Sequence, residues 1–294
     1  MRKERTIQER ADDKIFSFAE PVMGTVASFT IYRDNSGNDT RHHHRQEILS
    51  ILASACAILH QADGIFSTWK LDSPLSRYRR GEVSLEDVPA QVSEVLDLCH
   101  IAKDISDGWF DPWAIPGGVD PTGLVKGWAV ERALAELVGS GITGAMLNVG
   151  GDLAMSGRPG AEQHWRIGIR HPWIPDALAC VLETDVAVAT SGTYERGNIL
   201  IDPHSGLAEC RAASATVVGP SLALADALAT ALAVAGDIGI EWFRSLAGYE
   251  AYLIRTNGTE IATDGIKFAT EIPHERHENS VRAPSAGKIV RAST

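Results

Sequence analysis

Apolar residues recur at helical spacing in several stretches of the chain. They predict helices over residues 45–65, 89–105, 124–138 and 222–235, with a shorter one over 240–246. Short runs rich in β-formers predict strands over residues 23–32, 146–149, 165–169, 186–189, 198–201, 215–218 and 249–255, the last being the final core strand. Helices and strands mix without a regular βαβ rhythm, which favours an α+β fold over a doubly wound sheet.

The two ends of the chain lack this patterning. Residues 1–15 are polar and charged, and we expect a flexible N-terminus there. Residues 271–294 are polar with little periodicity and predict a disordered tail. Residues 16–270 remain as a single domain, a length that suffices for one large core.

Composition and net charge limit the classes of partner that the protein is expected to bind. The 294 residues carry a net charge of -11 with no run of lysines or arginines, which makes nucleic acid and anionic membranes poor partners. We see no apolar run of membrane length, no secretory signal and no N-terminal cysteine placed for a lipid, so we expect a cytoplasmic protein. Four cysteines without a C-x-x-C pair predict reduced, mostly buried thiols.

The predicted helix 222–235 carries the most informative polar pair. Almost every residue in it is Ala, Leu or Val, but Asp226 and Thr230 project from one face, one turn apart. A buried carboxylate is costly unless it is paired or binds a metal, and two oxygens at this spacing suit Mg²⁺. The alternative is a buried Asp that caps a neighbouring loop, with Thr230 bonding back to its own helix. The sequence leaves both interpretations open.

A second segment precedes the predicted helix at 124. Residues 120–123 (DPTG) form a turn into that helix, and Lys126 then falls in its first turn. A cation there opposes the helix dipole, which is better explained if a phosphate lies across the helix start than by a solvent-facing lysine. Asp111 would accept hydrogen bonds from a flavin or nucleotide, or serve as a turn residue. Trp69, in a polar loop, is either a stacking platform for a planar ring or a core residue.

Together, eight short segments resemble the ApbE-type FAD:protein FMN transferase family. They occur in the family's order: 21–25 (PVMGT), 66–69 (FSTW), 109–111 (WFD), 120–127 (DPTGLVKG), 148–152 (NVGGD), 189–192 (ATSG), 202–206 (DPHSG) and 225–230 (ADALAT). Each is weak alone, but eight in one order over residues 20–236 make a specific match.

The resemblance implies an α+β fold of two interlocked α/β lobes with FAD bound between them. It implies Mg²⁺-dependent transfer of FMN from FAD to a Thr or Ser hydroxyl of an acceptor flavoprotein, with release of AMP. Carried over by position, the metal ligands would be Gly123, Asp226 and Thr230. The FAD contacts would be Met23, Trp69, Trp109, Phe110, Asp111, Asp120, Lys126 and Ile201, with Asp226 and Lys126 also catalytic.

Two positions depart from the family pattern. The family usually has a His three residues before the Asp-Pro pair, thought to help catalysis, and this chain has Ile199 there. A general base contributes about 10²–10⁴-fold, so transfer would suffer, and nearby His204 is a candidate substitute. The alternatives are therefore a non-catalytic FAD-binding or carrier protein, or a slow FAD pyrophosphatase. The second departure is Arg79, where the family often has Asn.

Overall fold

The computed structural model describes residues 8–9, 15–33, 41–138, 141–160, 163–192, 200–270 and 290–291. Its α-helices are α1 (Arg41–Phe66), α2 (Pro74–Arg79), α3 (Ala90–Ile105), α4 (Thr122–Ala135), α5 (Leu222–Ala235) and α6 (Asp237–Ile240), with 3₁₀ turns at Leu85–Asp87, Pro112–Ala114 and Glu241–Arg244. Its strands are β1 (Gln8–Glu9), β2 (Ile15–Val22), β3 (Thr25–Arg33), β4 (Ile142–Val149), β5 (Asp152–Gly157), β6 (Trp165–Arg170), β7 (Leu178–Thr184), β8 (Ala187–Gly192), β9 (Ala212–Gly219), β10 (Glu250–Arg255), β11 (Glu260–Ala262) and β12 (Val290–Arg291).

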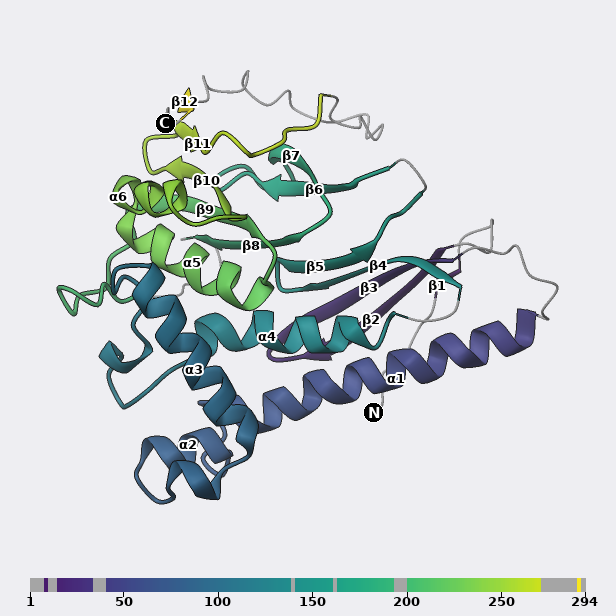
Figure 1. Cartoon of the computed structure of the whole chain (residues 1–294), viewed down its shortest axis with the longest axis horizontal. Coiled ribbons are helices and arrows are strands. Elements are labelled where there is room, and N and C mark those ends of the chain that lie inside the picture. The colour runs from purple at the N-terminus through teal and green to yellow at the C-terminus, as the bar shows by residue number, and fades with distance from the viewer. Residues whose placement is uncertain are drawn as a thin grey trace.

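Among the described residues, ten strands form one sheet in the order β1-β2-β3-β4-β5-β8-β9-β10-β11-β12, and β6 pairs with β7 in a separate hairpin. Neighbouring strands run antiparallel except β11 and β12, which are parallel. This mixture of helices with a mainly antiparallel sheet confirms the α+β prediction. The helices α1, α4 and α5 lie along one face of the sheet (Figure 1).

Strand β8 shows how the sheet separates two cores. Ala187 and Ala189 join the larger core beneath the helices, whereas Val188 joins a smaller one with Trp165 and Ile167 of the β6–β7 hairpin. The alternation follows from the period of two along a strand. Both faces are therefore covered, which explains why the residues of β8 and β9 are buried almost without interruption.

The crossing of α4 and α5 is unusually close. A Cβ added at Gly127 would lie 2.4 Å from the carbonyl oxygen of Leu222, a separation that real Cβ atoms do not show. Glu131, one turn further along α4, accepts a hydrogen bond from the backbone N–H of Leu222 at the start of α5. Burial raises the pKa of Glu131, although the backbone N–H groups of Leu222 and Ala223 and the Ser221 hydroxyl oppose this. The glycine and the carboxylate together fix how α4 sits on α5.

The predicted strand over 23–32 begins in the wrong place. Met23 and Gly24, with φ of 51° and 67°, form the two-residue turn of a hairpin whose first strand, β2, was missed. Two residues with positive φ suit the right-handed twist of a hairpin, and only Gly adopts that φ without strain. Met23 therefore occupies a strained backbone position at the tip of this hairpin.

Other boundaries also differ. The predicted final core strand is followed by β11, and helix 240–246 is a short α6 followed by a 3₁₀ turn. Of the strand predicted over 198–201, only residues 200 and 201 belong to the described part, where Ile201 forms an isolated bridge with Ala208. Ile199 lies outside the described residues. Helix α1 begins at Arg41, before the start of the helix predicted over 45–65.

Helix α1 corrects a second expectation. Within the described residues, 45–66 are long and apolar enough, by length and composition alone, to cross a membrane, which the sequence analysis had denied. The same test is passed by long core helices of soluble proteins. Ile48, Leu52 and Leu59 of α1 are buried in the larger core, which gives its apolar face a partner within the fold.

Candidate functional site

A cavity of about 250 Å³ opens between the start of α4, the middle of α5, the end of β8 and two loops. Loop residues 109–120 form one wall, and residues 200–203 form another. It is lined by Trp109, Phe110, Asp111, Pro112, Ile115, Asp120, Thr122, Gly123, Lys126, Ser191, Gly192, Leu200, Ile201, Pro203, Asp226, Thr230 and Val234. Segments widely separated in sequence thus meet at one place, and the residues carried over from the family resemblance make up much of the lining.

Helix α5 supplies two oxygens to this cavity. Asp226 is only 3% exposed, and its Oδ2 accepts a hydrogen bond from the backbone N–H of Gly127 at 3.3 Å. One turn later, the Thr230 hydroxyl lies 3.2 Å from the Ser191 hydroxyl of β8. A Cβ placed on Gly123 would come within 3.4 Å of Thr230 Oγ1, so the α4 backbone approaches that hydroxyl closely.

This oxygen-only set fits a small hard cation. Carboxylate, hydroxyl and backbone carbonyl groups are the ligands that Mg²⁺ takes, and it commonly fills its remaining positions with water or phosphate. Among the described residues, no group of three or more His, Cys, Asp or Glu side chains could hold a metal, so a transition-metal cluster finds no support there. Asp226, Thr230 and Gly123 all line the same cavity, as a shared Mg²⁺ site requires.

The Lys126 ammonium also reaches the cavity, from the second turn of α4 rather than the first turn expected. Its Nζ forms an ion pair with Oδ2 of Asp152, a residue with no exposed surface at the start of β5. The other oxygen of Asp152 accepts the backbone N–H of Thr190 at 3.2 Å. Burial raises the pKa of Asp152, and the Lys126 ammonium opposes that rise. Lys126 is therefore held at the cavity wall by a buried partner.

Two further carboxylates are fixed by contacts within the protein. Asp111 accepts the backbone N–H of Trp113 at 3.0 Å, and its other oxygen lies 2.7 Å from Lys103 Nζ. Asp111 is thus a turn residue that also lines the cavity. Asp120 accepts a hydrogen bond at 3.1 Å from the backbone N–H of Thr122, the first residue of α4. Arg79, the second departure from the family pattern, lies 4.0 Å from Asp120.

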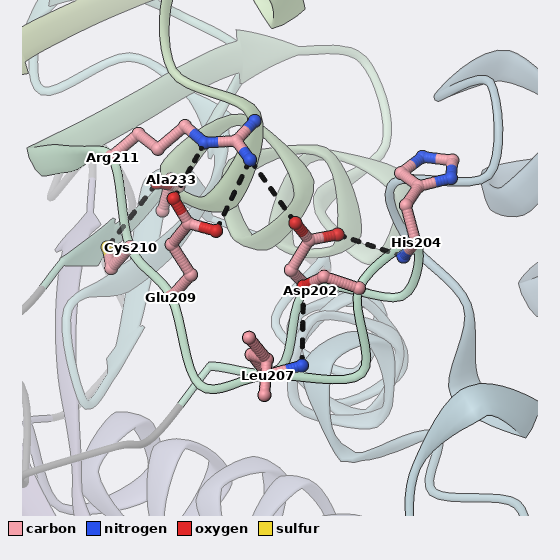
Figure 2. Close-up of polar contacts among 8 residues, drawn as sticks. Asp202, His204, Leu207, Glu209, Cys210, Arg211 and Ala233 are labelled. Atoms are coloured by element: carbon pink, nitrogen blue, oxygen red, sulfur yellow. Dashed lines mark hydrogen bonds and ion pairs between the residues drawn. The ribbon is translucent and has the colours of Figure 1, made fainter.

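The turn after Ile201 is tied to a buried carboxylate (Figure 2). Asp202 accepts the backbone N–H of His204 at 2.9 Å and pairs with Arg211 at 3.2 Å. Burial alone would raise the pKa of Asp202, but hydrogen bonds from the His204 and Ser205 backbones and the Ser205 hydroxyl, with the charge of Arg211, hold it below its ordinary value. This carboxylate is therefore an ionised anchor for the turn.

Three predicted site residues lie outside the cavity lining. Trp69 is 91% exposed on the loop between α1 and α2, and Met23 is at the β2–β3 turn. The His204 ring packs edge-on against Trp109, with centroids 4.5 Å apart. FAD contacts for Met23 and Trp69, and a catalytic role for His204, remain predictions.

Sequence reasoning gave no role to several side chains that shape the site. Asp152 and Ser191 lay in segments already noted, NVGGD and ATSG, but nothing in their spacing indicated that one pairs with Lys126 and the other faces Thr230. Arg211 had no sequence signal, because its partners Trp109 and Asp202 become neighbours only in the folded chain.

An α+β fold thus encloses a cavity in which the Asp226 carboxylate, the Thr230 hydroxyl and the Lys126 side chain meet. The sequence pattern of the ApbE family matches residues 23–117 and 116–253, and this chain belongs to that family. The resemblance described from the motifs is confirmed.

Curated relatives carry the name FAD:protein FMN transferase. The protein from Rhodobacter capsulatus is 37% identical over 163 residues, covering 52% of this chain and 29% of that protein. The one from Vibrio cholerae is 34% identical over 130 residues, covering 40% of this chain and 39% of the relative. The matched regions thus span well under two thirds of these two relatives.

Solved structures share the fold along nearly their whole length. The flavin transferase ApbE from Vibrio cholerae superposes with a TM-score of 0.68 at 21% identity, covering 88% of this chain and 97% of that one. The apo flavinyl transferase ApbE of Pseudomonas stutzeri superposes with a TM-score of 0.69 at 24% identity, covering 85% of this chain and 96% of that one. At these identities the likeness establishes the fold.

Proposed function

We propose that this chain binds FAD with Mg²⁺ in the cavity and transfers the FMN part of FAD to a Thr or Ser hydroxyl of an acceptor flavoprotein. The observation that carries the proposal is the meeting of Asp226, Thr230 and Lys126 in one cavity. The curated relatives, which are FAD:protein FMN transferases by name, support the reaction class.

In the proposed reaction, the acceptor oxygen bonds to the phosphorus that carries riboflavin. The bond from that phosphorus to the bridging oxygen breaks, AMP leaves with this oxygen, and the proton of the acceptor hydroxyl is released to water. A cation held by Asp226 and Thr230 would neutralise charge on the diphosphate.

The chain's own groups would bind and orient the ligand. The Lys126 ammonium, fixed by Asp152, would face a phosphate oxygen. Trp109 and Phe110 would give the flavin or adenine an apolar wall. Phosphoryl transfer depends mainly on positioning and electrostatics. A lysine, a bound cation and an apolar wall are therefore the kinds of group that the reaction needs.

The direct test mixes the protein with FAD, Mg²⁺ and a flavoprotein acceptor and follows in-gel flavin fluorescence. A fluorescent acceptor band that needs Mg²⁺ supports the proposal, and its absence with a family-type acceptor refutes it. Asp226→Asn should remove most Mg²⁺-dependent transfer. Asp237→Asn is the matched control, because Asp237 is on α6 and pairs with Arg255 away from the cavity.

The sequence motivates a second candidate, in which FAD is bound or slowly hydrolysed without transfer, because Ile199 stands where the family has His. AMP release with free FMN and no labelled acceptor would favour the pyrophosphatase. FAD binding without AMP would favour the carrier. If a missing base limits transfer, Ile199→His should raise acceptor labelling while FAD affinity stays unchanged.

A further inference from the structure

Trp109 is a cavity-wall side chain with two ring contacts from a distant part of the sequence. The guanidinium carbon of Arg211 lies 4.9 Å from the Trp109 ring centroid. The His204 ring meets Trp109 at 72°, in an edge-on arrangement. Both partners belong to the segment between β8 and β9, so Trp109 is where this segment meets the loop after α3.

Arg211 is also paired with two carboxylates (Figure 2). It donates to Asp202 at 3.2 Å and to Glu209 through two nitrogens at 3.1 and 3.3 Å. Asp202 holds the backbone of His204, and its neighbours Ile201 and Pro203 line the cavity. One guanidinium therefore touches both the Trp109 wall and the turn that forms the second wall.

The backbone beside this guanidinium is fixed to α5. Arg211 N–H donates to the carbonyl of Ala233 at 2.9 Å, and Cys210 Sγ lies 3.3 Å from the same oxygen. The next residue, Val234, lines the cavity. Arg211 thus connects three cavity walls, which are α5, the loop at Trp109 and the turn at Asp202.

We propose that Arg211 is a positioning residue that holds Trp109 and the 201–203 turn in place for the dinucleotide. The inference rests on the proposed function and adds a determinant of FAD affinity outside the cavity lining. A planar guanidinium can lie over an aromatic ring and pair with carboxylates in its own plane at once, whereas a lysine ammonium satisfies these partners less well.

The test compares Arg211→Met, Arg211→Lys and Arg255→Met. The Arg255 side chain is 30% exposed against 35% for Arg211, it also pairs with a carboxylate, and it is not among the residues lining the cavity. FAD affinity is measured by titration calorimetry in the presence of Mg²⁺. Acceptor labelling gives kcat and the KM for FAD, and urea denaturation checks that each variant folds.

Arg211→Met should raise the Kd and KM for FAD about 5- to 10-fold, with kcat within about 2-fold of the parent. Arg211→Lys should recover part of the affinity, and Arg255→Met should behave as the parent. In 5-fluorotryptophan-labelled apoprotein, the ¹⁹F resonance of Trp109 is assigned by its loss in Trp109→Phe. It should shift in Arg211→Met, shift less in Arg211→Lys, and keep the parent position in Arg255→Met.

The role is overturned if folded Arg211→Met binds FAD as the parent does, or if Arg255→Met weakens binding equally. Should Arg211→Met not fold, Arg211→Lys decides by the same measurements, and parent-like affinity with an unmoved Trp109 resonance rejects the role. A parent protein that binds no FAD overturns the proposed function and this inference with it. Normal parental binding with unaffected Arg211 variants overturns the inference alone.

Discussion

The buried pair between Lys126 and Asp152 should respond very differently to removal of its two halves. Asp152 has no exposed surface, whereas the Lys126 side chain is 25% exposed and borders the cavity. In Asp152→Asn the ammonium still reaches water, so we expect a loss of about 1–2 kcal/mol in the free energy of unfolding, below the usual cost of orphaning a buried charge. In Lys126→Met a fully buried carboxylate loses its cation, and we expect about 3–5 kcal/mol.

The pH dependence should separate the two variants further. Without the ammonium, burial holds the folded-state pKa of Asp152 above its unfolded value, so the folded protein binds the proton more tightly. The loss of stability caused by the unpaired Asp152 carboxylate is then absent below the pKa of Asp152 in the unfolded state. It grows as the pH rises to the pKa of Asp152 in the folded state, and it stays constant above that pH. Lys126→Met should therefore regain stability relative to the parent as the pH falls from about 8 to about 5, by at most about 1.4 kcal/mol per pH unit.

The assay is urea denaturation of the apoprotein in chelator, across this pH range, for the parent, both single variants and the double variant. Replacing both charges removes the orphaned carboxylate, so Lys126→Met/Asp152→Asn should be more stable than Lys126→Met at neutral pH. Equal losses in the two single variants, with no pH dependence in Lys126→Met, would show that the pair is not buried as the structure has it.

Three further outcomes follow from packing. Gly127→Ala should lower the free energy of unfolding, measured by urea denaturation, by about 1–3 kcal/mol, because its Cβ meets a main-chain carbonyl of α5. Gly64→Ala, with open space around it in α1, should leave the free energy of unfolding unchanged or raise it by up to about 1 kcal/mol. Equal effects of the two substitutions would count against the close crossing. Ser221→Ala removes the side-chain cap of α5 and should cost about 0.5–1 kcal/mol, since the bond to the backbone is long at 3.4 Å; an unchanged denaturation midpoint would argue that the cap contributes nothing. Burial raises the pKa of Cys99 and Cys180 to about 12, so neither should react quickly with a thiol reagent at mildly alkaline pH until denaturant is added; rapid labelling of either in native protein would contradict their burial.

The sequence predicted what depends on local pattern. Helix 222–235 is found as α5, with the same bounds, because its apolar composition and the Ser221 cap are both local signals. The prediction that the cysteines are mostly buried is likewise confirmed, since Cys56, Cys99 and Cys180 are buried and Cys210 is partly exposed. The motif-based resemblance brought most cavity residues together before any contact was known.

What the sequence missed depends on contacts between distant segments. Strands β5 and β7 were not predicted, and the hairpin turn at Met23 was read as strand because β-forming residues continue on both sides of it. The partner of Lys126 belongs to another element, and no spacing rule joins Lys126 to Asp152. Arg211 acquires its position through Trp109, Asp202 and Ala233, which lie in three separate segments.

The close approach of α4 and α5 at Gly127 has a consequence for two side chains that line the cavity. Lys126 lies on α4 and Asp226 on α5. At Gly127 the two helices contact each other through their backbones, so no side chain separates them there. The spacing of these two side chains is therefore set by the packing of α4 on α5 in the core. The loops over 109–120 and 200–203 form the other walls of the cavity and do not set this spacing.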